Sequence, residues 1–280
     1  MRDADGRLKG PEGLESGFLR VSIRPELNRG GTMAGKFATQ GGRVERERRF
    51  YARMAWFIVI AVVLGFGPSF YLKPLGLSFP RPNPELVPSL MVHGLVFTAW
   101  VALFFAQVSL VGASRRDLHR NLGVVGMVLG LVMIPVMYLT ATDMVARGST
   151  PPFTDPLTWS AVPMVAIPVF VVMLWLGWRE SRRDLAAHKR LMLGIMLMLL
   201  EPALHRLPLF PPTMLLNAVH MVLCWLVFVP LIVWDMRTLG RLHWATKTGA
   251  GLFALVIAAQ IFFLAVPGLW SSFVVLLPGF

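Results

Sequence analysis

Residues 93–123 read HGLVFTAWVALFFAQVSLVGASRRDLHRNLG and decide the fold class. The stretch is apolar up to Gly112, and Arg115, Arg116 and Arg120 follow shortly after it. An apolar run of about twenty residues is long enough to cross the ~30 Å hydrocarbon core of a bilayer as a helix. The arginines then predict a short loop at the cytoplasmic surface of the membrane. This combination is typical of a protein that crosses a membrane more than once.

The rest of the chain repeats this pattern. Hydrophobic residues make up 55% of the 280 positions and charged residues 15%, whereas a soluble domain carries about 25% charged residues. We predict seven apolar spans, near 54–72, 86–112, 121–141, 157–178, 190–210, 213–234 and 250–275. The sequence therefore predicts an all-α fold, a bundle of about seven transmembrane helices over residues 50–280. A disordered basic tail, residues 1–49, is expected before it, because that segment has few large apolar residues.

The net charge of +12 follows from the topology of this membrane domain. Eleven Lys and Arg residues fall in the predicted loops 113–120, 179–190 and 235–249, against four on the opposite side: Lys73, Arg81, Arg147 and Arg206. Because Lys and Arg gather in cytoplasmic loops, we predict the N-terminus inside and the C-terminus outside, in a bacterial inner (plasma) membrane. The expected partner is the lipid bilayer, whose anionic lipids attract such loops, and not nucleic acid.

The predicted fifth span, 190–210, is the most polar one. It contains Glu201, His205 and Arg206, and Pro202 is expected to kink its helix. The loop charges nevertheless alternate correctly across this segment, which favours a helix that crosses the membrane.

The six histidines fall into two layers under this topology. The outer layer, about 7–10 Å below the outer boundary at ~1.5 Å per helical residue, contains His93, His205 and His220. The inner layer, at the cytoplasmic starts of the third, fifth and seventh helices, contains His119, His188 and His243. Ionisable side chains inside a span are costly and usually face the interior of a bundle, so the outer layer is the main candidate site.

Spacing adds further side chains to the outer layer. Glu201 and His205 are four residues apart and share one face of a helix. His93 and Trp100 are seven apart and also share a face. On the predicted sixth helix, one face is shared by Asn217, His220 and Cys224.

Three interpretations fit these residues. Two outer histidines are suited to bind a b-type haem as axial ligands, with Trp100 packed on the porphyrin; His119 and His188 then bind a second haem, or else anchor headgroups and cap helices. Alternatively, a divalent metal, Zn or Fe, is held by Glu201, His93, His205 and His220, since three protein ligands plus water make a hydrolytic centre. In the remaining alternative, Glu201 pairs with a histidine or with Arg206 in a structural hydrogen-bond network.

Three segments of the sequence resemble other membrane proteins: RRFYARMAWFIVIAVVLGFGPSFY at 48–71, the stretch 93–123, and AHKRLMLGIMLMLLEPALHRLP at 187–208. They resemble a family of uncharacterised bacterial multi-pass membrane proteins. More distantly, the helix that begins with HG and the LHR motif after it are similar to the ascorbate-reducible dihaem b-type transmembrane cytochromes.

The cytochrome resemblance implies two haems. His93 would bind the outer haem with His205 or His220, and His119 would bind the inner haem with His188. The chain departs from the cytochrome pattern because its fourth predicted helix has no histidine, and because His119 and His188 lie at helix ends.

The first functional hypothesis is therefore a haem b-binding electron-transfer protein of the membrane. The alternatives are a metal-dependent membrane hydrolase or transferase, and a non-catalytic scaffold or assembly factor. Whether the protein is an enzyme is left open, and the sequence names no substrate, no electron donor or acceptor, and no oligomeric state.

Overall fold

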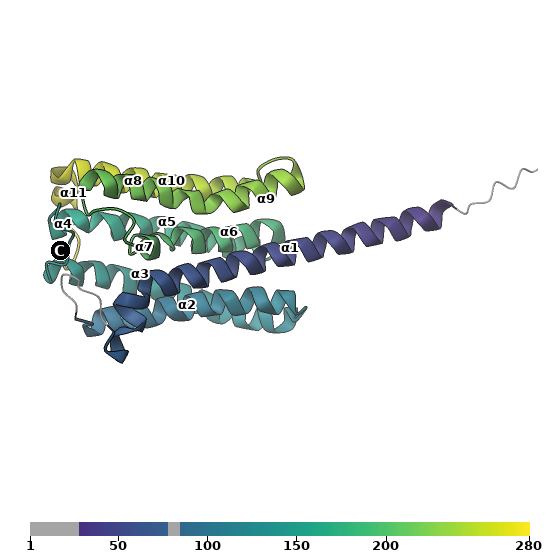
Figure 1. The fold of residues 1–280 in the computed structure, drawn as a ribbon, viewed down its shortest axis with the longest axis horizontal. Helices are drawn as coiled ribbons and strands as arrows, with labels where there is room; N and C mark the ends of the chain where they lie inside the picture. Colours follow the sequence, from purple (N-terminus) through teal and green to yellow (C-terminus); the bar gives the residue numbers. More distant parts are fainter. Residues whose placement is uncertain (1–27, 78–84) are drawn as a thin grey trace, which may run out of the picture. The chain divides into compact units, whose positions relative to one another are not determined.

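The computed structural model describes the backbone of residues 28–77 and 85–280, and the side chains from residue 41 onward in those ranges. The chain forms two compact units, residues 1–46 and 47–280. The described part of the first unit is a single stretch of helix. The second unit is a bundle of helices that lie side by side (Figure 1). The start of the predicted tail, residues 1–27, and Arg81 lie outside the described residues.

All regular structure in the described ranges is helical, as predicted. In chain order the helices are α1 (Asn28–Phe66), α2 (Pro88–Gly112), α3 (Arg116–Ala146), α4 (Pro156–Trp159), α5 (Ala161–Glu180), α6 (Leu185–Met198), α7 (Glu201–Leu204), α8 (Met214–Cys224), α9 (Val229–Leu239), α10 (Trp244–Ala265) and α11 (Pro267–Val274). Short π- or 3-10-helical turns lie at Gly67–Tyr71, Lys73–Leu75 and Trp225–Phe228.

Six stretches of helix among the described residues are long and apolar enough to cross a membrane. They are Gly41–Tyr71, Pro88–Gly112, Arg116–Ala146, Pro156–Glu180, Met214–Leu239 and Trp244–Ala265. Each of them matches one of the predicted spans. The chain is therefore a multi-pass membrane protein whose helices contact the lipid bilayer.

The remaining predicted span, the fifth, is divided into two helices. α6 ends at Met198 after 14 residues, and α7 begins at Glu201. Pro202 explains the break, because its nitrogen has no hydrogen to donate to the carbonyl of Met198 and its ring crowds that turn. α6 is nevertheless central to the bundle, since it packs against α5 and α10 and is buried along most of its length. It is not one of the six long helices, and its crossing of a bilayer stays a prediction.

Asp184 determines where α6 begins. Its carboxylate accepts hydrogen bonds from the backbone N–H groups of Ala186 at 2.9 Å and Ala187 at 3.0 Å. Burial acts to raise the pKa of Asp184, but the hydrogen bonds from Ala187, Ala186 and Trp244, together with the charge of His243, hold this pKa below its usual value. The cap is therefore charged at neutral pH and satisfies two backbone donors at the helix N-terminus.

Helix α1 begins at Asn28, inside the segment that was predicted to be a disordered tail. The prediction is wrong from that residue onward. No proline lies between Asn28 and Phe66, and extending a helix from its apolar part costs less than starting one. Glu45 and Arg49, four residues apart, also place opposite charges on one face of the helix.

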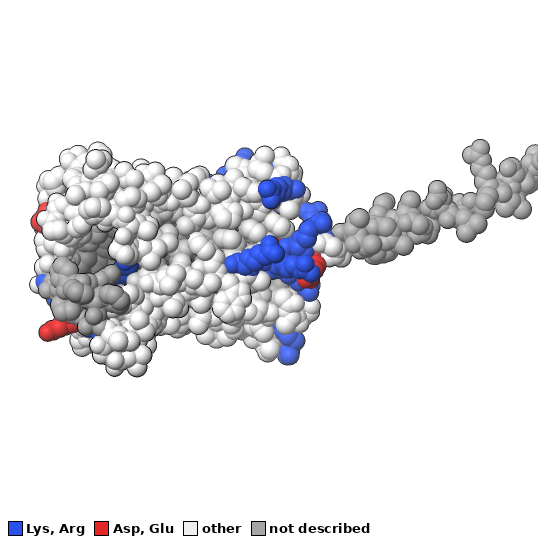
Figure 2. All heavy atoms as spheres, in the orientation of Figure 1, with Lys and Arg blue, Asp and Glu red and all other residues white. Residues whose placement is uncertain are grey.

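Lys and Arg side chains gather at one end of the bundle (Figure 2). The loops 113–115, 181–184 and 240–243 lie at this end, which we call the basic end. Arg190, predicted as the last residue of the loop 179–190 and the first of the fifth span, lies inside the bundle on α6 and is 3% exposed. Its Nε and Nη2 atoms donate to Oδ1 of Asp235 at 2.9 and 2.7 Å. Placing Arg190 at the surface was wrong, because a buried carboxylate compensates its charge.

Candidate metal centre

The candidate centre is built by two short helices that contact each other, α7 and α8. His205 is the residue that terminates α7, and His220 and Cys224 lie on α8. Their spacing of four residues places His220 and Cys224 on the same face of α8, one turn apart. Thr213 fixes the start of α8, because its hydroxyl accepts a hydrogen bond from the backbone N–H of Leu216 at 3.3 Å.

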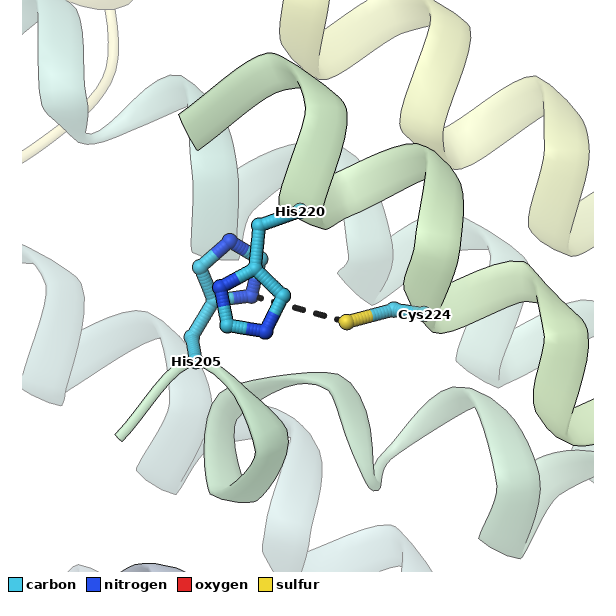
Figure 3. A group of neighbouring side chains, drawn as sticks. All are labelled: His205, His220 and Cys224. Carbon is cyan, nitrogen blue, oxygen red and sulfur yellow. Dashed lines mark hydrogen bonds between the residues drawn. The ribbon is translucent and has the colours of Figure 1, made fainter. Parts of the chain in front are cut away.

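The three side chains converge on one another (Figure 3). The rings of His205 and His220 are stacked, with 4.2 Å between centroids and 23° between planes. The Sγ atom of Cys224 lies 3.8 Å from Nδ1 of His205. One ligand atom from each residue can be chosen so that all three lie within 4.8 Å of one another. His220 is 7% and Cys224 2% exposed, so the donors are shielded from solvent.

These three side chains could hold a transition-metal ion. Zn²⁺ binds histidine nitrogen at about 2.0–2.1 Å and cysteine sulfur at about 2.3 Å in tetrahedral geometry, which places neighbouring donor atoms about 3.3–3.6 Å apart. The 3.8 Å between Cys224 Sγ and His205 Nδ1 is already close to that value. Three donors leave the fourth tetrahedral position open, which is the arrangement of catalytic and not structural zinc sites.

A buried carboxylate lies one helical turn before His205. Oε2 of Glu201 accepts a hydrogen bond from Nε2 of Gln260 at 3.2 Å, and the same amide nitrogen donates to the carbonyl of Val162 at 3.0 Å. The other oxygen of Glu201, Oε1, and the Nε2 atom of His205 are buried without a hydrogen-bond partner among the described residues. Unpaired buried polar atoms are costly, so their presence beside the centre favours a further bound group there.

The structure brings together two of the four predicted metal ligands, His205 and His220. His93 lies outside the group of three: its ring stacks on Phe97 with 4.2 Å between centroids. Its Nδ1 atom is buried and has no hydrogen-bond partner among the described residues. Glu201 is also not one of the three donors, and its hydrogen-bond partner is Gln260 rather than a histidine or Arg206.

Trp100 packs in the core of the bundle. Its ring meets Phe170 of α5 edge to face, with 6.2 Å between centroids. On α3, a Cβ atom at Gly130 would lie only 3.2 Å from the Trp100 ring, so a glycine there lets α2 and α3 approach closely. These contacts give Trp100 a packing role between three helices.

The inner layer of histidines lies at helix starts, as predicted. His119 and His188 are each the fourth residue of their helices, α3 and α6, and are close enough for their charges to interact. Nδ1 of His188 lies 2.7 Å from the carbonyl of Gly177. His243 is the N-cap of α10, where its Nδ1 atom accepts a hydrogen bond from the backbone N–H of Ala245 at 3.2 Å.

The stacked pair does not fit a haem between its two rings. Axial ligands direct a nitrogen at the iron from opposite faces of the porphyrin, whereas His205 and His220 lie face to face at 4.2 Å. This separation leaves no room for a porphyrin between them. A haem between His93 and one of these histidines, the pair implied by the cytochrome resemblance, is not tested by this stacking and stays a prediction.

Sequence reasoning missed Cys224 as a candidate ligand, although it placed Cys224 on the face of His220. The signal was the pattern H-x-x-x-C within one helix, which puts two donors one turn apart. It also missed Gln260 and Asp235 as the partners of Glu201 and Arg190. Those pairs are 59 and 45 residues apart in the chain, so no local pattern connects them.

Comparison with known protein families, with curated proteins and with solved structures finds no match for this chain. The resemblance to dihaem cytochromes and to an uncharacterised bacterial family therefore stays a prediction from the sequence.

Proposed function

We propose that this protein crosses the inner (plasma) membrane of a bacterium seven times, with its N-terminus inside and its C-terminus outside, and is a metal-dependent membrane hydrolase or transferase. The metal ion, zinc in the first instance, is held by His205, His220 and Cys224. The convergence of these three donors carries the proposal.

The seventh crossing is made by α6 and α7 together. α5 ends at the basic end and α8 begins at the opposite end, so the chain from 181 to 213 returns along the bundle (Figure 1). The cations at the basic end favour a cytoplasmic location for that end. The metal centre then lies toward the outer face of the membrane.

The open fourth position determines the chemistry that such a centre supplies. A zinc ion with three protein ligands lowers the pKa of a bound water to about 7 and so provides a nucleophile at neutral pH. Glu201 would take the proton of such a water; it lies one turn from His205, and one of its oxygens has no partner among the described residues. In hydrolysis, the water oxygen bonds to the carbon or phosphorus of an ester, the bond to the leaving oxygen breaks, and the proton passes to that oxygen.

Metal analysis and cobalt substitution test the proposal. We expect protein purified from zinc-replete cells to contain stoichiometric zinc. After exchange for Co²⁺, a thiolate-to-cobalt charge-transfer band should appear in the near ultraviolet, and C224S should abolish it. Loss of a residue that only hydrogen-bonds to a metal ligand typically lowers metal affinity roughly 10–100-fold. H220A removes a proposed ligand itself and should therefore lower the affinity by more than this.

His243 offers a matched control, because it is a histidine at a helix start outside the centre. H243N keeps a capping side chain and should leave metal content and the cobalt spectrum unchanged. The proposal would be wrong if cobalt binding survived both H220A and C224S. A Soret band in the purified protein that H93A removes would instead support the haem hypothesis, and neither metal nor pigment would support a scaffold.

A further inference from the structure

An exposed apolar segment borders the metal centre. All residues from 208 to 215, PLFPPTML, are exposed, and all but Thr213 are apolar. Leu209 is 60% and Leu215 73% exposed. We call this segment the apolar lip. It connects α7 to α8, the two helices that carry the metal ligands.

The apolar lip contacts one of these ligands. The ring of Phe210 meets the ring of His220 edge to face, with 5.4 Å between centroids. The face of α8 beside the ligands is also apolar and exposed at Val219, Val222 and Leu223. An apolar surface of this kind, at the end of a membrane helix, is suited to lie among lipid acyl chains. The side chains exposed next to His220 are therefore apolar, both on the apolar lip and on α8.

A cation is the next residue in the chain after one of the proposed ligands, since Arg206 directly follows His205. Its position is fixed, since Nη1 donates to the carbonyl of Pro202 at 2.6 Å and the guanidinium lies 4.3 Å from the ring centre of Phe66. A guanidinium at this depth attracts an anionic group, phosphate above all.

We propose that the metal centre acts on an anionic amphiphile, a lipid with a phosphate headgroup, which reaches the metal from the outer leaflet across the apolar lip. The acyl chain lies against the apolar lip and the exposed face of α8. The phosphate lies between Arg206 and the metal ligands. This inference rests on the proposed metal centre and names its substrate class.

Cobalt-substituted protein in phosphatidylcholine nanodiscs provides the test. We expect palmitoyl lysophosphatidic acid to shift the cobalt absorption bands in a saturable way. Monopalmitoyl glycerol, which has the chain without the phosphate, should leave the bands unchanged. Glycerol 3-phosphate, which has the phosphate without the chain, should require at least a tenfold higher concentration, on the order expected when about 1.4 kcal/mol of binding free energy is lost.

Two variants with matched controls complete the test. R206Q should weaken the response to lysophosphatidic acid about tenfold or more while cobalt bands persist in the variant without ligand, whereas R147Q, at the same end of the bundle, should bind normally. L209D should also weaken the response, whereas L185D, an exposed leucine at the basic end, should not.

The possible failures are distinguishable. An equal response to glycerol 3-phosphate would show that the chain is not recognised and would overturn the inference, while the cobalt bands would still support the metal centre. An equal response to monopalmitoyl glycerol would overturn recognition of the phosphate. Absence of the cobalt bands in the unaltered protein would overturn the metal centre itself, and the inference with it.

Discussion

At the residue scale, the ion pair of Arg190 and Asp235 shows how a charge is kept inside an apolar bundle. Oδ1 of Asp235 accepts both hydrogen bonds from Arg190, and Oδ2 accepts from the hydroxyl of Thr246 at 2.6 Å and from the backbone N–H of His243 at 2.9 Å. Every oxygen of this carboxylate is thus satisfied. The pair joins α6 to α9 and to the start of α10.

We predict that D235A lowers the free energy of unfolding by about 3–5 kcal/mol, because it leaves the Arg190 guanidinium buried without its counter-ion. The double variant R190M/D235L replaces both charges by apolar groups of similar volume and should be much less destabilised. Unfolding in detergent micelles, followed by circular dichroism, measures both. Equal stability of D235A and the unaltered protein would contradict this account of the pair.

Residue-level prediction from the sequence worked inside single helices. The spacing of His220 and Cys224 placed both on one face of α8, and the polar character of Glu201 and His205 marked the site. The spacing of residues within one helix could not predict which residues of different helices come into contact. His205 meets Cys224 because α7 ends beside α8, and Asp235 was overlooked because its partner Arg190 looked like a loop cation.

At the element scale, α1 packs against α7, directly after the break between α6 and α7. Gly65 of α1 lies directly against the backbone of Ala203 in α7, and a Cβ atom at Gly65 would collide with the Ala203 carbonyl group. Ala203 is fully buried and lies two residues before His205. The position of His205, a proposed metal ligand, therefore depends on a glycine in another helix.

We predict that G65A destabilises the protein by about 1–3 kcal/mol, the usual cost of forcing extra volume into a packed contact. It should also weaken cobalt binding, because α7 must move. G251A, at a helical glycine with open space around it, serves as the control and should be neutral or stabilising by up to about 1 kcal/mol. Identical metal affinity in G65A and G251A would show that α1 does not position His205.

Hydropathy was sufficient to locate the six long apolar stretches of helix, because each carries a long apolar run. It was insufficient for α6 and α7, since Pro202 interrupts the hydrogen bonds of a segment that is otherwise buried by its neighbours. It also failed for the start of α1, where charged residues form helix because an apolar helix follows them.

At the scale of the whole molecule, the two ends of the bundle differ in chemistry. Lys and Arg gather at the basic end (Figure 2), whereas the opposite end carries the apolar lip and the candidate metal centre. The proposed seven crossings would place these ends on opposite sides of the membrane, with cations facing the cytoplasm. A chain in which α6 and α7 did not cross would place residues 183 and 212 on the same side.

Cysteine labelling decides between these arrangements. Cys224 is the single cysteine of the chain, so C224S provides a background into which R183C, P212C and R241C are introduced, all at exposed positions. With a membrane-impermeant maleimide, we predict that P212C is labelled in intact spheroplasts, and that R183C and R241C are labelled only in inverted vesicles. In the proposed topology the chain crosses the membrane through α6 and α7, so residues 183 and 212 lie on opposite sides of it. Labelling of R183C and P212C from the same side would contradict the proposed crossing by α6 and α7. It would also contradict the proposed location of the metal centre near the outer face.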